Sequence, residues 1–483
     1  MVFSSPIFVF LFLPLVLAVY FISPKSVRNA VLLVASLLFY AWGEGKYVAV
    51  MLLSICLNYF AALTLERTTN ARGTRWVLAL AVVLNLLLLG ILKYASFVIR
   101  TVGMVVMIPP VATDFVSAVR LPIGISFYTF QAMSYVIDVY RREVSAERNL
   151  LNTALYISFF PQLIAGPIVR YSEIAYQFVN RRVTTAEFAY GIQRFILGMS
   201  KKVLLANPLA ITADYVFSLR PEVLSFGMAW LGVICYTLQI YFDFSGYSDM
   251  AIGLAHMFGF RFPENFNYPY ISQSVREFWR RWHITLSNWF RDYLFIPLGG
   301  SRCSTARTYF NLLVVFALCG LWHGPSWTFV LWGLFHGTFM VLERIALDRW
   351  LTASWSVVRH TYTLLVVMVG WVFFRSDSFD QALVFLVKMF SIRGLAFGGD
   401  SMPLLTPGLV LIISVAILVS TPVPANWLKS RSFRSTVAAA NDVATVGEMG
   451  GALASVVMLI CLLVVSLMFI AADTYSPFLY FRF

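Results

Sequence analysis

Two histidines in aromatic surroundings carry the clearest chemical signal in this sequence, which holds five histidines in all. His323 follows the apolar run Leu312–Leu321 and precedes Gly324-Pro325, a pair that can open a helix. Histidine is the side chain whose ordinary pKa suits a general base near neutral pH. The pattern therefore fits a catalytic base, and it fits equally a histidine that caps or bridges helices.

His283 ends a second aromatic stretch, Glu277-Phe-Trp-Arg-Arg-Trp-His283, in which arginines stand beside tryptophans. Tryptophan suits a membrane–water interface, and arginine makes bidentate contacts to phosphate. The stretch therefore fits an interfacial anchor or a site for a phosphate-rich thioester such as coenzyme A. Together with the tryptophan next to His323, the candidate binding residues here are Trp279, Arg280, Arg281, Trp282 and Trp322. The remaining histidines are interpreted as packing or interfacial residues: His256, His336 and His360.

A third cluster, Tyr241-Phe-Asp-Phe-Ser-Gly-Tyr-Ser-Asp249, combines carboxylates with hydroxyls. Ser245 and Asp249 are four residues apart and can share one face of a helix, whereas Asp243 and Ser245 cannot. The carboxylates could orient a histidine or line a polar path to a substrate. The alternative is a helix cap, in which the last Ser and Asp begin a helix at Met250. The candidate binding residues of this cluster are Asp243, Ser245 and Asp249.

The composition limits the elements that can position these residues. Of the 483 residues, 60% are hydrophobic and 12% are charged, with a mean hydropathy of +0.78. These values exclude a cytosolic globular enzyme, a disordered chain and a disulfide scaffold. The five cysteines are scattered, so neither a disulfide framework nor a metal site is expected. The net charge of +13 comes from basic residues between apolar runs, which indicates contact with lipid headgroups and not with nucleic acid.

Apolar runs of the kind that cross a bilayer recur along the chain and predict about nine to twelve crossings. They lie near 5–23, 29–42, 46–64, 76–98, 120–138, 150–169, 188–207, 226–242, 311–319, 326–345, 361–374, 405–421 and 451–471. Prolines interrupt them at Leu121-Pro-Ile-Gly124, Phe160-Pro161 and Gly166-Pro167. Broken helices survive inside a membrane only where protein or water satisfies the backbone, so a cavity is expected in the middle of the protein.

The distribution of basic residues predicts the orientation. The first run, Met1–Tyr20, lacks the basic start and the cleavage site of a secretory signal, so we expect a retained membrane helix. Basic clusters in alternate loops are placed in the cytoplasm by the positive-inside rule. This orientation puts the N-terminus outside the cytoplasm. The basic clusters are Lys25/Arg28, Arg67/Arg72/Arg75 and Arg141/Arg142/Arg148.

With these motifs the sequence resembles the membrane-bound O-acyltransferase (MBOAT) family over essentially its whole length. The subgroup that it resembles is that of bacterial polysaccharide O-acetyltransferases, which includes the alginate acetylation proteins. The stretch from about 40 to 75 fits the alginate proteins poorly, so a cellulose-acetylating relative is an alternative. Besides the clusters above, the resemblance rests on Leu121-Pro-Ile-Gly-Ile-Ser-Phe, Ile164-Ala-Gly-Pro167, Glu264-Asn-Phe, Pro269-Tyr-Ile-Ser, Gly320-Leu-Trp-His323-Gly and Tyr475-Ser-Pro-Phe-Leu-Tyr.

The resemblance implies an all-α polytopic membrane protein of the bacterial inner membrane. Its expected fold is a multi-helix bundle around a central tunnel, with re-entrant or interfacial helices. It would form a single domain over 1–483, with a motif-rich core at about 120–345 and C-terminal helices at about 361–483. His323 matches the family's catalytic histidine, and His283 matches its second histidine position.

The same resemblance implies the reactants. Acetyl-CoA from the cytoplasm would be the acetyl donor, with no permanently bound cofactor. Membrane lipids, a periplasmic esterase-like acetyltransferase and other exopolysaccharide-assembly proteins are the expected partners. Two alternatives remain at this stage. A relative could move a D-alanyl or fatty acyl group, or a transporter could use Asp243, Asp249, His283 and His323 as an ion relay.

Overall fold

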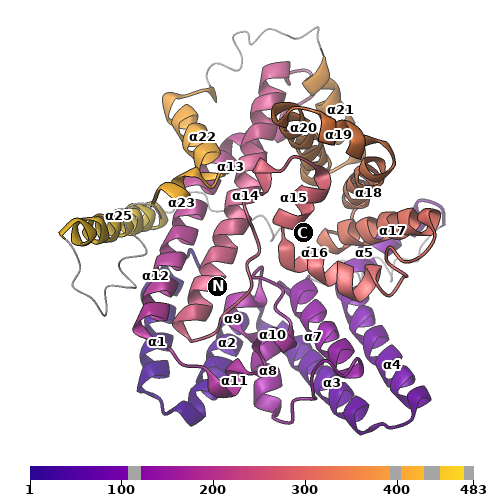
Figure 1. Ribbon diagram of the computed structural model, residues 1–483, viewed down its shortest axis with the longest axis vertical. Coiled ribbons are helices and arrows are strands. Elements are labelled where there is room, and N and C mark those ends of the chain that lie inside the picture. The colour runs from indigo at the N-terminus through magenta and orange to yellow at the C-terminus, as the bar shows by residue number, and fades with distance from the viewer. Residues whose placement is uncertain (107–120, 392–403, 429–445, 473–483) are drawn as a thin grey trace. The chain divides into compact units, whose positions relative to one another are not determined.

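The computed structural model describes residues 1–106, 121–391, 404–428 and 446–472, and every regular element within these ranges is helical (Figure 1). The all-α prediction is therefore confirmed for the described residues. The motif that begins at Tyr475 lies outside them.

Seven helical stretches of the described chain are long and apolar enough to cross a membrane, and two shorter apolar helices accompany them. The chain is thus polytopic, as predicted, but the stretches are fewer than the apolar runs suggest. The runs at 29–42 and 46–64 belong to one helical stretch, Lys25–Arg67, and the runs at 120–138 and 150–169 give shorter helices. The seven are Lys25–Arg67, Ala71–Gly103, Thr185–Phe217, Thr305–His323, Trp327–Ala353, Ser356–Arg375 and Leu453–Ala471.

The chain divides into two compact units. The first comprises residues 1–191 and 251–263, and the second comprises residues 192–250 and 264–483. The prediction of a single domain around a central tunnel stays a prediction. The longer helices of the first unit are α1 (Leu13–Ile22), α2 (Arg28–Glu44), α3 (Val48–Arg67), α4 (Ala71–Leu89), α5 (Ala95–Gly103), α7 (Ile125–Tyr140) and α8 (Leu150–Ser158).

Helix α7 lies at the centre of the first unit, where it packs against both α3 and α4. It begins after Gly124, whose φ of 79° is left-handed, and a Cβ at that position would lie 2.6 Å from the carbonyl oxygen of Leu163. Helix α8 ends at Ser158, and the short α9 (Phe160–Leu163) carries a proline in its first turn. Residues 121–124 and Gly166-Pro167 are also non-helical, so all three interruptions predicted from proline are confirmed, while the expected cavity stays a prediction.

The second unit contains the motif-rich segments. Its helices include most of α12 (Thr185–Ser200), then α13 (Asn207–Phe217), most of α14 (Phe226–Met257), α15 (Val275–Arg281), α16 (Ile284–Phe290), α17 (Thr305–His323), α18 (Trp327–Leu342), α19 (Asp348–Ala353), α20 (Ser356–Arg375), α21 (Phe379–Phe390), α22 (Pro407–Val419), α23 (Val423–Leu428) and α25 (Val446–Ala471). A π-helical turn, Lys201–Ala206, joins α12 to α13.

Helix α14 is continuous through the third motif. It runs over 32 residues, so the alternative in which Asp249 caps a new helix at Met250 is wrong. The segment from Phe226 to Met250 contains no proline that would break the helix, and the backbone of Gly246 packs closely on Gly198. Asp249 therefore points from the interior of a helix.

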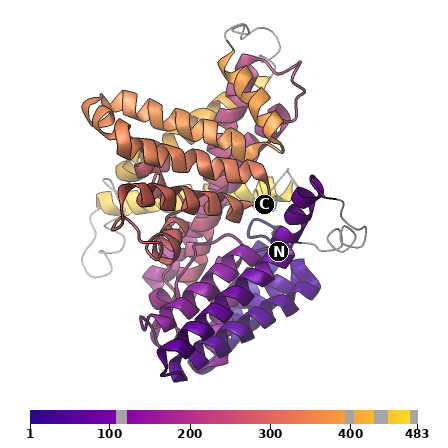
Figure 2. The ribbon, with the colours of Figure 1, turned by 90° about the vertical axis from the view of Figure 1, so that its right-hand side faces the viewer.

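Helices α17 and α18 form the tightest helix pair of the second unit, and α18 also packs on α20. Figure 2 shows these helices, drawn in orange and brown, running alongside one another. A Cβ on Gly320 would lie 2.1 Å from the carbonyl oxygen of Phe329, and one on Gly333 would lie 2.1 Å from that of Phe316. Glycine thus permits backbone contact between the two helices, and this contact fixes the end of α17.

Candidate active site

His323 is the last residue of α17 and is buried. The helix ends there because Gly324 adopts an extended backbone and Pro325 follows, after which Ser326 caps α18. The helix opening predicted at Gly324-Pro325 is confirmed. The imidazole ring of His323 lies 5.1 Å from Trp332 and 5.2 Å from Phe374, measured between ring centroids.

His283 lies in the turn between α15 and α16 and is fully buried. Its ring centroid is 6.4 Å from that of His323 and 6.1 Å from that of Trp322, which adjoins His323 at 5.0 Å. The tertiary structure therefore brings the two predicted histidines and Trp322 into one buried site. In the sequence, His283 lies outside the candidate membrane-spanning helices, between Thr185–Phe217 and Thr305–His323. Burial lowers the pKa of its imidazole to about 3.

Asn265 holds the backbone and the side chain of the His283 turn. Its side-chain oxygen Oδ1 lies 3.1 Å from His283 Nδ1, and Oδ1 also accepts hydrogen bonds from the backbone N–H and the hydroxyl of Thr285 at 3.3 and 2.9 Å. Sequence reasoning did not single out this asparagine. The Glu264-Asn-Phe motif was noted only for its resemblance, and spacing alone gave no signal that it reaches His283.

The stretch before His283 divides between the interior and the surface. Trp279 and Trp282 are buried, whereas Arg280 is exposed and Arg281 is half-buried in an ion pair with Glu277 at 2.9 Å. These residues belong to or directly follow the seven-residue helix α15, where residues three apart share a face and adjacent residues do not. This periodicity places the tryptophans and the arginines on different sides. The tryptophans are therefore part of the buried site, and the two arginines lie at its outer side.

The buried tryptophans form an aromatic layer with a further histidine. Trp279 lies 5.6 Å from Trp332 and 5.2 Å from His336, and Trp282 lies 4.9 Å from Trp371. The interpretation of His336 as a packing residue agrees with its complete burial and its four aromatic neighbours. This layer surrounds the histidines with apolar surface and limits the access of bulk water.

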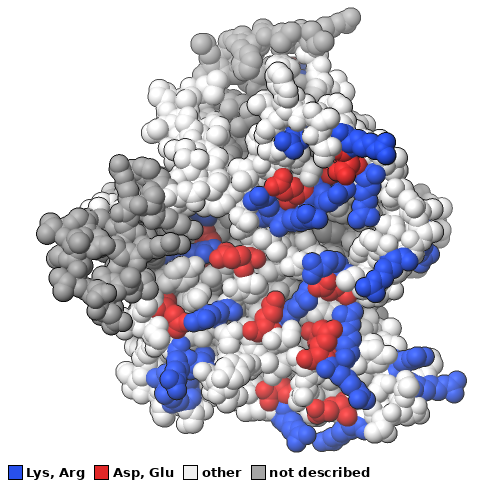
Figure 3. Space-filling model, in the orientation of Figure 1, with Lys and Arg blue, Asp and Glu red and all other residues white. Residues whose placement is uncertain are grey.

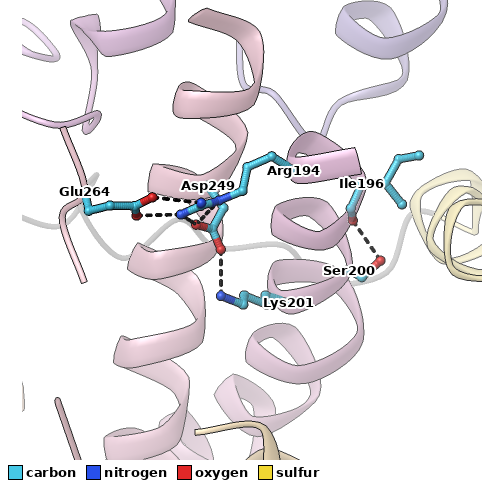
Figure 4. A network of polar contacts seen from close by, with 6 residues as sticks. All are labelled: Arg194, Ile196, Ser200, Lys201, Asp249 and Glu264. Atoms are coloured by element: carbon cyan, nitrogen blue, oxygen red, sulfur yellow. Dashed lines mark hydrogen bonds and ion pairs between the residues drawn. The ribbon is translucent and has the colours of Figure 1, made fainter. Parts of the chain in front are cut away.

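The aspartates of the third motif are engaged in ion pairs. Lys202 Nζ donates to Asp243 Oδ1 at 2.5 Å, and the side chains are only 3% and 2% exposed. Asp249 accepts from Lys201 Nζ at 2.6 Å and from Arg194 Nε at 2.8 Å (Figure 4). Lys201 and Lys202 lie within the apolar run 188–207, and buried ammonium groups require acidic partners. The sequence therefore contained a signal from which these ion pairs could have been predicted.

Arg194 extends this network to Glu264, the residue before Asn265. Its two terminal nitrogens donate to the two carboxylate oxygens of Glu264 at 2.9 and 2.6 Å (Figure 4). The geometry is the bidentate fork that arginine favours with carboxylates. The third motif is thus linked through Arg194 to the segment that holds His283.

Ser245 is buried on α14, and within the described residues its hydroxyl has no hydrogen-bond partner. The next residue toward the N-terminus, Phe244, packs edge-on against the His283 ring at 4.7 Å. Helix α14 therefore reaches the histidine site through this aromatic contact, while its two aspartates form the ion pairs described above.

Charged side chains gather on part of the surface. On the face drawn in Figure 3, Lys and Arg side chains alternate with Asp and Glu, while other stretches of the same face carry neither. The uncharged stretches agree with a protein whose outer surface meets lipid.

Comparison with known proteins assigns the chain to a protein family. The sequence model of the family described as membrane-bound O-acyltransferase matches residues 139–376. The chain is 43% identical to the probable alginate O-acetylase AlgI of Azotobacter vinelandii over the full length of both proteins. The chain belongs to the membrane-bound O-acyltransferase family. It is also 40% identical, again over both full lengths, to the probable alginate O-acetylase AlgI of Pseudomonas aeruginosa. A peptidoglycan O-acetyltransferase of Helicobacter pylori is 37% identical over 82% of this chain and 81% of the relative.

Family membership makes this MBOAT protein an O-acyltransferase and a multi-pass membrane protein, so the resemblance read from its motifs is confirmed. The alternative of a transporter with an ion relay loses its support. Asp243 and Asp249, the two carboxylates of that relay, are engaged by lysine and arginine side chains.

Proposed function

We propose that this MBOAT protein takes acetyl groups from cytoplasmic acetyl-CoA and passes them across the bacterial inner membrane for O-acetylation of an exported exopolysaccharide. The single observation that carries the proposal is the buried pair of histidines, whose ring centroids lie 6.4 Å apart within an aromatic site. The names of the full-length relatives support acetyl as the group transferred.

In the proposed reaction, His323 acts as the general base. It takes the proton of the acceptor hydroxyl while the oxygen attacks the acetyl carbonyl carbon and a C–O bond forms. The C–S bond then breaks, its electron pair leaves on the sulfur of coenzyme A, and the imidazolium returns the proton to that sulfur. His283, Trp279, Trp282 and Trp322 position the substrates, and the aromatic lining keeps the thioester away from water.

Acetyl-CoA is the proposed donor and no permanently bound cofactor is needed. Arg280 and Arg281 lie at the outer side of the site, where guanidinium groups can contact the phosphates of coenzyme A. Asp243, Ser245 and Asp249 support the site through α14, and the ion pairs of the two aspartates favour a role in holding the helices.

The immediate acceptor is proposed to be a hydroxyl on a periplasmic esterase-like acetyltransferase, which then acetylates the polymer together with other exopolysaccharide-assembly proteins. The reason is topological, because acetyl-CoA is cytoplasmic whereas an exported polymer is not. The N-terminus is proposed to lie in the periplasm, with the basic loops in the cytoplasm. Between alginate and cellulose, alginate is the better supported polymer, since two of the three relatives described above are named for it.

Transfer from radiolabelled acetyl-CoA in membranes tests the proposal. Wild type and His323→Gln are compared at matched expression, and the substitution should lower transfer by about 10²–10⁴-fold, the usual contribution of a general base. His360→Gln is the matched control, because His360 is half-buried and its Nδ1 lies near a single backbone oxygen, that of Ser272. Equal transfer by wild type and His323→Gln would remove His323 from the chemistry. Transfer of a fatty acyl group in preference to acetyl would overturn the proposed donor.

A further inference from the structure

The turn that carries His283 has an unusual backbone. His283 has φ 44° and ψ 54°, a left-handed conformation that costs a residue other than glycine on the order of 1 kcal/mol or more. The Asn265 segment lies beside this turn. Ile284 donates its N–H to the carbonyl oxygen of Asn265 at 2.9 Å, and Asn267 donates to that of Arg281 at 2.9 Å. The backbone of the asparagine segment therefore fixes the turn from both sides.

One backbone group determines which way the Asn265 amide faces. The Thr285 N–H points to the Asn265 side chain at 3.3 Å, and a backbone N–H can only donate. The atom that receives it must be the carbonyl oxygen Oδ1, because the amide NH₂ has no lone pair to offer. The Thr285 hydroxyl donates to the same oxygen at 2.9 Å. The orientation of the asparagine amide thus follows from the hydrogen bonds around it.

The same oxygen determines the tautomer of His283. Nδ1 of His283 lies 3.1 Å from Asn265 Oδ1, and an oxygen that only accepts requires a proton on that nitrogen. A neutral imidazole carries one ring proton, so Nε2 bears a lone pair. The complete burial of His283 and the low pKa of its imidazole keep the ring neutral at physiological pH. Phe244, edge-on at 89° to the imidazole, packs against the ring on a further side.

We propose that Asn265 is a positioning residue that holds His283 in the Nδ1–H tautomer, so that Nε2 is a hydrogen-bond acceptor in the site shared with His323. The inference rests on the proposed function, because it assigns a role to the same histidine pair. It also has a mechanistic consequence. Nε2 of a neutral His283 accepts a substrate donor, such as an amide N–H of the pantetheine arm, and does not donate to an oxyanion.

The ¹⁵N chemical shifts of the histidine rings test the tautomer without any substrate. Full-length protein labelled with ¹⁵N-histidine is reconstituted in nanodiscs at pH 7, and the His283 signals are assigned by their loss in His283→Gln. The expected result is a protonated Nδ1 and an unprotonated Nε2. A protonated Nε2 in the wild-type protein would overturn the proposal directly, whatever the outcome of the transfer assay.

Two substitutions test whether Asn265 is the cause. Asn265→Leu removes the acceptor, so His283 should lose its single tautomer and acetyl transfer should fall by about 10²–10⁴-fold. Asn265→Asp keeps an acceptor opposite Nδ1 and should keep both the tautomer and more of the activity. Thr285→Val is the matched control, since the Thr285 backbone N–H still orients the amide. An unchanged His283 spectrum in folded Asn265→Leu would contradict the proposal.

The two proposals fail in distinguishable ways. A wild-type protein with Nδ1–H on His283 but no transfer from acetyl-CoA would overturn the proposed function and leave the tautomer assignment intact. A protein that transfers acetyl groups while His283 carries its proton on Nε2 would overturn the tautomer assignment and leave the proposed function intact.

Discussion

Two regions of the second unit bury ionisable side chains, and they do so by different means. On α14, Asp243 and Asp249 are matched by lysine and arginine at 2.5–2.8 Å. At the ends of α15 and α17, His283 and His323 are packed among aromatic rings, and an asparagine amide contacts His283. The carboxylates are engaged by opposite charges, whereas the contacts described for the imidazoles are with aromatic rings and an amide.

The difference follows from the cost of burying charge. A carboxylate at 2% exposure needs a close cation to offset the cost of its burial, so the ion pair holds two helical segments together. An imidazole can be buried as a neutral ring at far lower cost and still accept a proton. The histidine region is therefore suited to chemistry, whereas the carboxylate region is suited to holding the helices in place.

The largest effect should come from breaking the most buried ion pair. Asp243→Asn leaves the Lys202 ammonium without its carboxylate partner and should destabilise the protein by about 3–5 kcal/mol. The thermal unfolding midpoint in detergent measures this loss. Asp243→Leu combined with Lys202→Met should recover most of it, because neither charge remains buried. A well-folded Asp243→Asn variant that has lost transfer would mean that this carboxylate takes part in the chemistry, and the contrast with the histidines would disappear.

An intermediate effect is expected where α17 and α18 touch. Gly333→Ala places a methyl group 2.1 Å from the Phe316 carbonyl oxygen, so the helices must separate and the end of α17 must shift. We expect a loss of about 1–3 kcal/mol in stability together with reduced transfer, since His323 ends that helix. Gly90→Ala is the control, because its added methyl group meets no atom within 4 Å. Unchanged transfer in Gly333→Ala would show that the histidine pair tolerates displacement.

The smallest effect is expected at the outer carboxylate. Asp249→Asn weakens contacts to Arg194 and Lys201, whose side chains are 21% and 25% exposed, and Arg194 keeps its bond to Glu264. Water and Glu264 compensate for the weakened contacts, so the loss of stability should be about 1 kcal/mol and should become smaller as the salt concentration increases. Unfolding midpoints at low and high salt measure it. A loss as large as that of Asp243→Asn would contradict the ranking by burial.

The sequence predicted the features that local pattern controls. Apolar runs identified a polytopic helical protein, and Gly324-Pro325 predicted the end of α17 at His323. Aromatic context singled out His283 and His323 before their proximity was known. Local pattern was misleading at Asp249, where a favourable cap residue lies inside a 32-residue helix because its charge is paired with residues of the neighbouring helix.

Only the tertiary structure decided which side chains meet. Lys202 reaches Asp243, Asn265 reaches His283, and Trp332 lies against His323, although each pair comes from different elements. Residue type and spacing fix which groups can be buried and where a helix must stop, because those depend on a few neighbouring residues. Partners are selected by helix packing, since the position of one helix against another depends on contacts summed over the whole interface.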